Sequence, residues 1–319
     1  MAEAAANAGA RAALLELPSP YPIVPGRFKL LEERDGADPD ALLESIVSGD
    51  YDRPFVVDDG TSRALHFSLR YIQSEMRVAR PFELALAYTR KMMGFLLFVA
   101  QPRNVLLLGL GGGSLAKYCH RHLPLARITV VEIDPDVIAF RDEFLVPADD
   151  ARFKVVCADA ADFIRAGRQR FDAILVDVFD RSGFAGSVSA PGFYAAASQR
   201  LSPGGVLVAN LAGAQGERVA HLAMIHQTFG DAMLAVPVAD EDNAVVFAFR
   251  NRDFQPRWPL LGSQAKSMRG RYEIDFPYIA SRMELSRKAR YLERFLRTAG
   301  GAAEATAAAA CGSLRDGAG

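Results

Sequence analysis

The fold of this chain is decided by the stretch Val105-Leu106-Leu107-Leu108-Gly109-Leu110-Gly111-Gly112-Gly113-Ser114. An apolar run enters a glycine-rich turn, and a helical pattern over residues 114–122 follows it, so we expect a buried strand, a tight turn and a helix. Glycine suits such a turn because a Cβ would keep a ligand away from the backbone, and because the turn often needs positive φ. By itself the turn fits either a nucleotide site or a plain tight turn, and it does not distinguish a dinucleotide from an S-adenosyl ligand.

The same alternation of apolar runs and helical patterns continues along the chain. Strand-like runs lie at residues 105–110, 128–133, 153–157, 173–178, 206–210, 233–238 and 244–249. Helical patterns lie at 114–122, 135–143, 160–166, 191–201 and 217–229. Strands that are apolar throughout and alternate with helices predict a parallel sheet covered on both faces. The connection 239–243 is too short for a helical crossover, which predicts an antiparallel hairpin at one sheet edge. This ending is typical of the class I methyltransferase-like (Rossmann-like) α/β fold with a seven-stranded sheet, rather than of the dinucleotide-binding arrangement.

The rest of the chain predicts a division into five parts. We expect a disordered N-terminus over 1–20, a small β-domain over 21–81, the methyltransferase-like domain over 82–252, a helical extension over 253–299 and a disordered tail over 300–319. The β-domain rests on strand-like runs at 28–33, 54–60 and 63–69, and a helix is expected at 82–99. The extension begins with a linker that holds Trp258 and continues as a helix at about 279–298. The two ends are rich in Ala and Gly, which offer little apolar surface to offset the entropy of ordering.

Two acidic residues follow the strands after the glycine turn. Glu132 ends the next strand, about 20 residues on, where an acid can accept hydrogen bonds from both ribose hydroxyls; a solvated carboxylate at a strand end is the alternative. Asp159 ends the third strand and suits an adenine amino group, or it caps the following helix, or it does both. Glycine, acid and acid at three successive strand ends point to a nucleoside site more specifically than any one of them does.

The fourth strand carries the residues that suggest chemistry. Asp177 stands at its carboxyl end, where open α/β sheets bind ligands, and Asp180 starts a loop of small residues that could close over a substrate. An amine nucleophile is mostly protonated at neutral pH, so one carboxylate can hold the amine while the other accepts its proton. The alternative is that Asp177 merely ends the strand and Asp180 forms a turn.

Composition and charge exclude several classes of function. Lys and Arg number 37 against 38 Asp and Glu, so no overall field attracts nucleic acid or an anionic membrane. No apolar run approaches the roughly 20 residues of a membrane span. The cysteines Cys119, Cys157 and Cys311 are far apart, and neither they nor the histidines show metal-ligand spacing. We therefore expect a cytoplasmic protein without a metal site and without nucleic-acid or membrane partners.

From about residue 56 to residue 249, the chain resembles the spermidine/spermine synthase family, the polyamine aminopropyltransferases, and within it a divergent bacterial spermidine-synthase-like group. In that family a small β-domain precedes a methyltransferase-like domain, and decarboxylated S-adenosylmethionine donates an aminopropyl group. The resemblance implies this donor as a co-substrate, with no tightly bound cofactor, and a small amine or polyamine as the acceptor. Family members are often dimers or tetramers, which is compatible with a homodimer, although the sequence itself establishes no assembly.

The resemblance also assigns roles to residues of this sequence. Asp177 is implied as the base and Asp180 as the anchor of the amine, with Tyr88 lining the active site. The implied donor site consists of Gln73, Gly109, Gly111, Gly112, Ser114, Glu132, Asp159 and Ala160.

Four positions depart from the family pattern. Ser114 stands where synthases typically carry an Asp that binds the amine of the donor. Arg181 replaces a proline after the Asp-x-x-Asp, and Asn210 replaces a Gln that usually meets the diamine. A Tyr found before the last hairpin has no counterpart at residues 235–238. The resemblance therefore supports the nucleoside site more fully than the diamine pocket.

Three functions follow from these observations. The first is aminopropyl transfer from decarboxylated S-adenosylmethionine to an amine in polyamine metabolism. The second is an S-adenosylmethionine-dependent methyltransferase on the same fold, because Ser114, unlike an acid, would not repel the carboxylate of the intact donor. The third is a catalytically degenerate nucleoside-binding protein.

Overall fold

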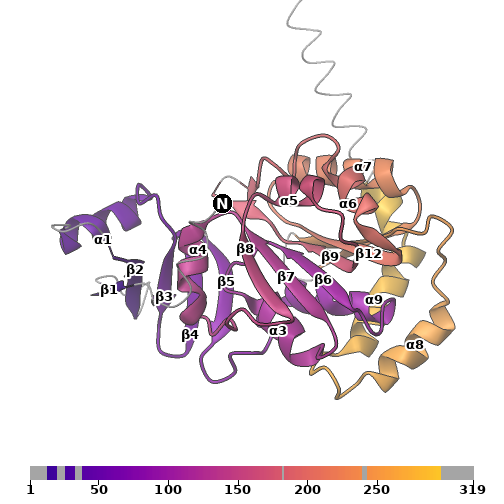
Figure 1. Ribbon diagram of the computed structural model, residues 1–319, viewed down its shortest axis with the longest axis horizontal. Helices are drawn as coiled ribbons and strands as arrows, with labels where there is room; N and C mark the ends of the chain where they lie inside the picture. The colour runs from indigo at the N-terminus through magenta and orange to yellow at the C-terminus, as the bar shows by residue number, and fades with distance from the viewer. Residues whose placement is uncertain (1–12, 20–25, 33–37, 182, 239–242, 296–319) are drawn as a thin grey trace, which may run out of the picture.

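The computed structural model describes residues 13–19, 26–32, 38–181, 183–238 and 243–295 (Figure 1). The predicted disordered segments 1–12 and 300–319 lie outside these residues, as does most of the hairpin connection, 239–242.

The N-terminal part is an antiparallel sheet whose five strands follow one another in sequence order. They are β1 (Leu14–Pro18), β2 (Arg27–Leu31), β3 (Phe55–Asp58), β4 (Ser62–Ser68) and β5 (Tyr71–Arg77). The small β-sheet expected from the sequence is thus present, but the prediction of disorder up to residue 20 is wrong for β1. Leu14 pairs with Leu31 and Leu17 is buried, so this segment has the apolar side chains needed to join the sheet.

Helix α1 (Pro39–Ser48) connects β2 to β3 and was not among the predicted elements. Asp38 accepts a hydrogen bond from the amide of Asp40 and caps the helix, and Pro39 occupies its first turn. Gly49 ends the helix at φ +89°, in the left-handed conformation that favours glycine.

The main sheet has seven strands in the order β13-β14-β12-β9-β6-β7-β8. Their bounds are β6 (Asn104–Leu108), β7 (Arg127–Glu132), β8 (Phe153–Cys157), β9 (Phe171–Val176), β12 (Leu201–Leu211), β13 (Met233–Pro237) and β14 (Ala244–Phe249). Strands β12, β9, β6, β7 and β8 are parallel to one another, whereas β14 is antiparallel to both β12 and β13. The predicted parallel sheet with an antiparallel edge hairpin is confirmed.

Helices cover both faces of this sheet (Figure 1). Three pack on one face: α5 (Ala160–Ala166), α6 (Phe193–Gln199) and α7 (Gln215–Phe229). On the other face lie α2 (Ala87–Met92), the 3-10 helix η1 (Met93–Leu97), α3 (Ser114–His122), α8 (Trp258–Ser267) and α9 (Phe276–Lys288). Successive strand residues alternate between the two cores, as their period of two requires: Leu107 and Leu175 join one, Leu106 and Ile174 the other.

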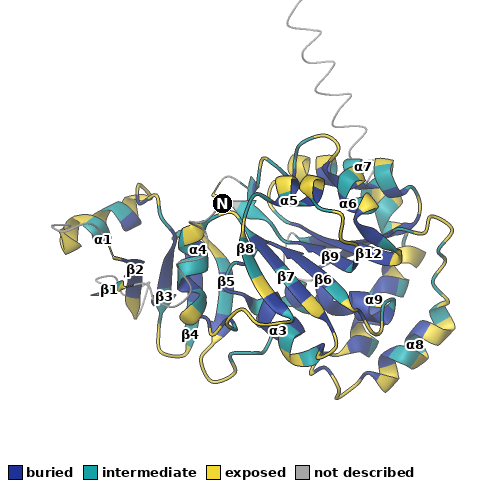
Figure 2. Cartoon of the chain, in the orientation of Figure 1, coloured by how far each residue is buried: buried dark blue, intermediate teal, exposed yellow. Residues whose placement is uncertain are grey.

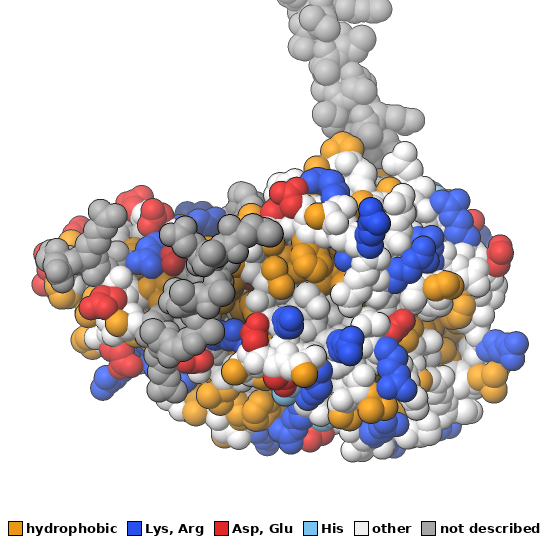
Figure 3. Space-filling view, in the orientation of Figure 1, with side chains coloured by type: hydrophobic (Ala, Val, Ile, Leu, Met, Phe, Trp, Pro, Cys, Tyr) orange, Lys and Arg blue, Asp and Glu red, His pale blue; other side chains and the backbone are white. Residues whose placement is uncertain are grey.

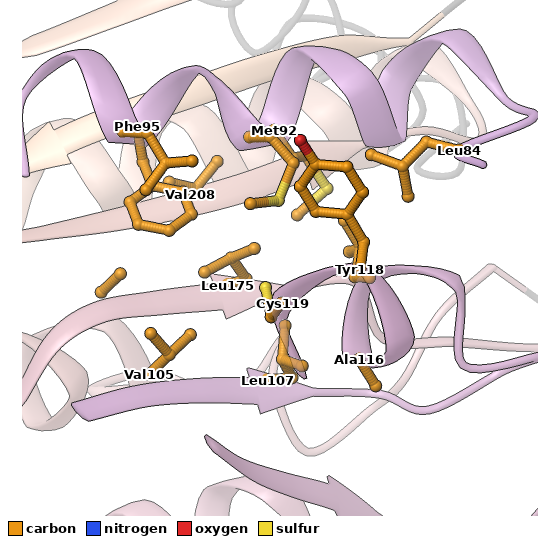
Figure 4. Packing of buried hydrophobic residues seen from close by; sticks show 14 of the residues in the cluster. Leu84, Met92, Phe95, Val105, Leu107, Ala116, Tyr118, Cys119, Leu175 and Val208 are labelled. Atoms are coloured by element: carbon orange, nitrogen blue, oxygen red, sulfur yellow. The ribbon is translucent and has the colours of Figure 1, made fainter. Parts of the chain in front are cut away.

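The first of these cores is shown in Figure 4, where Met92 and Phe95 lie over Leu175 and Val208. The predicted helix at 82–99 is shorter than expected, because regular α-helix ends at Met92 and a 3-10 turn follows. Gly94 lies in that turn, and a Cβ there would lie 2.7 Å from the Met283 side chain, so close packing against α9 accompanies the change. Figure 2 shows the sheet strands as the most continuously buried part of the chain.

In the described residues, the C-terminal extension contains helices α8 and α9 and a further helical stretch at 291–295, and the expected linker is the start of α8. Trp258 begins α8, and the Arg287 guanidinium lies 4.9 Å from the centre of its ring. Helix α9 begins at Phe276 because the Asp275 side chain caps it, and it ends at Lys288. Residues 291–295 are helical again, and the predicted end at 298 lies outside the described residues.

The N-terminal sheet is held against the main sheet through the segment after β7, which contains α4 (Pro135–Ala139) and the 3-10 helix η2 (Phe140–Asp142). Arg53 pairs with Asp136 at 2.8 Å, and Lys29 pairs with Glu143 at 2.7 Å. Apolar residues of the small sheet also join the main core, namely Leu31, Val56, Leu65 and Met76. The small sheet is therefore packed beside the carboxyl ends of the main-sheet strands, where it can form one wall of a site.

The face of the molecule in Figure 3 carries both acidic and basic side chains. None of the helices in the described ranges combines the length and the apolar character that crossing a membrane requires.

Candidate active site

A cavity of about 350 Å³ lies over the carboxyl ends of β6, β7, β8 and β9. Nine of the residues predicted for the site line it: Gln73, Tyr88, Gly109, Gly111, Ser114, Glu132, Asp159, Ala160 and Asp177. Gly112 does not line it, and the side chain of Asp180 lies outside the described part of the structure. The parallel strands and the small sheet thus bring together residues from Gln73 to Asp177, 104 positions apart in the sequence.

Gly109 occupies a position that no other residue could take without moving the backbone. Its φ is +95°, and a Cβ would lie 2.1 Å from the carbonyl oxygen of Asp177. The strands β6 and β9 therefore approach closely where the glycine turn begins, and Asp177 is fixed beside that turn.

Gly112 serves packing rather than the cavity surface. A Cβ at this position would lie 2.8 Å from Ser74 Oγ and 2.9 Å from the ring of Phe144. The absence of a side chain lets the glycine turn sit between the small sheet and the segment after β7.

Glu132 is bound to the glycine turn at the end of β7. Its Oε2 accepts a hydrogen bond from the Leu110 amide at 2.8 Å, and its Oε1 accepts one from the Asp134 amide at 3.0 Å. Burial raises the pKa of Glu132, although these amides act in the opposite direction. Each carboxylate oxygen keeps a second lone pair, so the group can still accept hydrogen bonds from two ligand hydroxyls.

Asp159 caps helix α5, as one of its two interpretations predicts. Its Oδ1 accepts hydrogen bonds from the amides of Ala161 and Asp162 at 2.8 and 2.9 Å. Burial acts to raise its pKa, but hydrogen bonds from Ser187 and from these two amides outweigh burial and lower it. Asp159 is therefore an ionised acceptor in the cavity wall, beside Ala160.

Asp177 is half-buried and is held by two neutral donors. Asn210 Nδ2 donates to its Oδ1 at 2.9 Å, and the Tyr88 hydroxyl donates to its Oδ2 at 3.1 Å. Burial raises the pKa of Asp177 to about 6, and these two hydrogen bonds limit the rise. The carboxyl group is therefore largely ionised at neutral pH and is also basic enough to accept a proton.

The loop after Asp177 covers one side of the cavity. It contains the short hairpin β10 (Phe179–Asp180) and β11 (Gly183–Phe184), and Ala185, Gly186 and Ser187 line the cavity. Arg181 donates to the carbonyl of Arg53 at 3.3 Å and so joins the loop to the small sheet.

His221 on α7 anchors the same loop from the other side. Its ring stacks on Phe184 with 3.9 Å between centroids, and its Nε2 lies 3.0 Å from Ser189 Oγ. Its Nδ1 lies 2.7 Å from the Tyr194 hydroxyl. Burial lowers the pKa of His221 to about 4, so the ring is neutral at neutral pH and acts as a packing and hydrogen-bonding partner.

Three residues around the cavity could not be assigned from sequence patterns. Asn210 was identified only as a departure from a family pattern, and its contact with Asp177 was not predicted. Ser187 and Ser74 carry no sequence signal, since isolated serines in a loop and a strand are common. Ser74 Oγ lies 3.5 Å from Ser114 Oγ, and the two hydroxyls share the wall near Gly111.

Comparison with known proteins identifies the family. A model of the spermine/spermidine synthase domain matches residues 85–236. Over 230 residues the chain is 34% identical to a polyamine aminopropyltransferase of Chromobacterium violaceum, covering 72% of this chain and 88% of the relative. The chain belongs to the spermine/spermidine synthase family.

Solved structures show the same fold at low sequence identity. A spermidine synthase in complex with the transition state analogue AdoDATO superposes with a TM-score of 0.58 at 17% identity, covering 89% of this chain and 88% of that one. Human methyltransferase-like protein 13 in complex with SAH gives a TM-score of 0.53 at 24% identity, covering 59% and 93%. The fold of this spermine/spermidine synthase family member is thus shared with an S-adenosyl-binding methyltransferase.

The geometry predicts that Glu132 is needed for nucleoside binding. We expect Glu132→Gln to weaken the binding of methylthioadenosine by roughly 10- to 100-fold, because hydrogen bonds to a charged acceptor are lost. Isothermal titration calorimetry measures this effect, with Glu44→Gln on the exposed face of α1 as the matched control. Equal affinity of the wild type and Glu132→Gln would contradict the assignment.

Proposed function

We propose that this chain transfers an aminopropyl group from decarboxylated S-adenosylmethionine to a small amine or polyamine, with Asp177 as the base. The observation that carries the proposal is the position of Asp177, which shares one cavity with Glu132 and Asp159 and is held there by neutral donors. The enzyme is of the polyamine aminopropyltransferase type, as membership of the family supports.

In the proposed complex the two acids at the ends of β7 and β8 bind the nucleoside. Glu132 accepts the ribose hydroxyls, and Asp159 accepts a hydrogen bond from the adenine amino group. The glycine turn of β6 lies between β7 and β9, so the sulfonium branch of the donor crosses Gly109 and reaches Asp177. An S-adenosyl-type co-substrate is also compatible with the ligands named for the structural neighbours, AdoDATO and SAH.

In the reaction the amine nitrogen attacks the methylene carbon beside the sulfonium. A C–N bond forms and the C–S bond breaks, and the sulfur keeps the electron pair and leaves as neutral methylthioadenosine. The proton of the amine passes to Asp177, whose raised pKa makes it a stronger base than an exposed aspartate. Before transfer, the same negative charge stabilises the cationic amine and the sulfonium.

We place the reaction in the cytoplasm. Both cysteines in the described residues, Cys119 and Cys157, are free thiols, as a reducing compartment favours.

One observation favours the methyltransferase as a second candidate. Beside Gly111 the cavity is lined by the hydroxyls of Ser74 and Ser114, and position 114 is where the family pattern has an acid. A neutral wall of this kind would not repel the carboxylate of intact S-adenosylmethionine.

The base role predicts that Asp177→Asn abolishes turnover without abolishing nucleoside binding. We expect methylthioadenosine release from decarboxylated S-adenosylmethionine with putrescine, cadaverine or spermidine to fall by about 10²- to 10⁴-fold. Methylthioadenosine should still raise the melting temperature, and Asp162→Asn on the exposed face of α5 serves as the control. Release of no methylthioadenosine by the wild type with any of the three amines would contradict the proposal.

The two candidate functions predict opposite donor preferences. We expect calorimetry to show tighter binding of the decarboxylated donor, because its side chain carries a net positive charge toward Asp177. Tighter binding of intact S-adenosylmethionine, with transfer of a methyl group, would favour the methyltransferase instead.

A further inference from the structure

Asn210 is a polar residue on an otherwise apolar strand. It follows Val206-Leu207-Val208-Ala209 in β12, in the middle of the main sheet, and its exposed fraction is 3%. Burying an amide in this setting is unfavourable unless its hydrogen bonds are made. In the described ranges, the side chain makes one hydrogen bond, from Nδ2 to Asp177 Oδ1, and Asn210 Oδ1 is buried without a partner. The contact with Asp177 is therefore the interaction that the amide serves.

We infer that Asn210 is the positioning residue of Asp177, orienting its carboxylate and holding it in the ionised form that accepts a proton on Oδ2. The inference rests on the proposed function only in that the proton accepted by Asp177 comes from the attacking amine. It extends the set of site residues by one that lies outside the residues lining the cavity and acts through the base.

The two donors on Asp177 differ in what they can do after proton transfer. An amide NH₂ only donates, so Asn210 favours the ionised carboxylate and occupies Oδ1. A hydroxyl can donate or accept, so Tyr88 donates to Oδ2 of the ionised group and can turn to accept from it once it is protonated. Asn210 thus keeps Asp177 Oδ1 unprotonated. Tyr88 can hydrogen-bond to Asp177 Oδ2 whether that oxygen is ionised or protonated.

The surroundings of Asp177 leave this control to neutral groups. Asn210 from β12 and Tyr88 from α2 are the hydrogen-bonding groups acting on it, and no charged side chain of the described residues contributes. Burial raises the pKa of Asp177 and the two donors oppose this rise, the Asn210 hydrogen bond more strongly than the Tyr88 hydrogen bond. Removing the amide should therefore raise the pKa further.

The test is a direct titration of the Asp177 carboxyl by ¹³C NMR in the full-length protein, with its signal assigned by Asp177→Asn. We expect a midpoint near 6 in the wild type. Asn210→Leu, which keeps the side-chain size and removes the donor, should move it upward by roughly one to two pH units. Asn210→Ala repeats the test where Leu does not fold, and Tyr88→Phe should shift the midpoint in the same direction by less.

The matched control is Asn104→Leu. This residue begins β6 at the amino ends of the parallel strands, opposite the cavity, where its Oδ1 accepts a hydrogen bond from Gln169. Its replacement should leave the Asp177 midpoint unchanged. An unchanged midpoint in folded Asn210→Leu and Asn210→Ala would overturn the inference.

Turnover supplies the second readout. The acid limb of the pH profile of kcat/KM should move upward with the NMR midpoint. The affinity for methylthioadenosine should stay within about twofold of the wild type, because Asn210 does not line the cavity. A shifted NMR midpoint in a protein that transfers no aminopropyl group would contradict the proposed function and leave the inference intact.

Discussion

The site depends on the close contact between two parallel strands, β6 and β9, at the start of the glycine turn. The Asp177 amide donates to the Leu108 carbonyl at 2.9 Å, and the Gly109 amide donates to the Val131 carbonyl at 2.8 Å. The backbone hydrogen bonds between the parallel strands therefore continue past the ends of β9 and β6. A Cβ at position 109 would meet the Asp177 carbonyl. A residue other than glycine at this position would therefore force Asp177 away from the start of the glycine turn.

This arrangement places three carboxylates around one cavity and gives each a different environment. Glu132 is half-buried, accepts hydrogen bonds from two backbone amides and has a raised pKa. Asp159 caps a helix and has a lowered pKa. Asp177 receives neutral side-chain donors and has a raised pKa. The pKa values of Glu132 and Asp177 are both raised, but backbone amides hold the first and side-chain donors hold the second, and such differences in environment suit carboxyl groups to different tasks. Two of them suit fixed hydrogen bonding to a nucleoside, and the third suits proton transfer.

The sequence predicted those features that depend on local order and on parallel pairing. The glycine turn, the acids at strand ends and the edge hairpin follow from alternation and connection length, because parallel strands place their carboxyl ends on one edge. The sequence also contains clear signals for α1, such as Asp38, Pro39 and Gly49. The strand-like runs on either side of α1 favoured the prediction of a sheet without a helix. Strand β1 was missed because the alanines around it outweighed its three leucines.

Contacts between distant residues could not be predicted in this way. The hydrogen bond from Asn210 to Asp177 joins neighbouring strands at a particular register, and Ser187 reaches Asp159 only through the path of a loop. Neither the residue types nor their spacing in the sequence predicts such contacts. The prediction that Gly112 lines the ligand site was wrong because a glycine needed for packing and one needed for close approach of a ligand have the same sequence pattern.

A crystal structure of the protein with methylthioadenosine addresses the central claim most directly. The account predicts one nucleoside over the ends of β6 to β9, with the ribose hydroxyls on Glu132, the adenine amino group on Asp159 and the sulfur turned toward Asp177. A nucleoside bound elsewhere, or one that leaves any of these three carboxylates out of its surroundings, would contradict it.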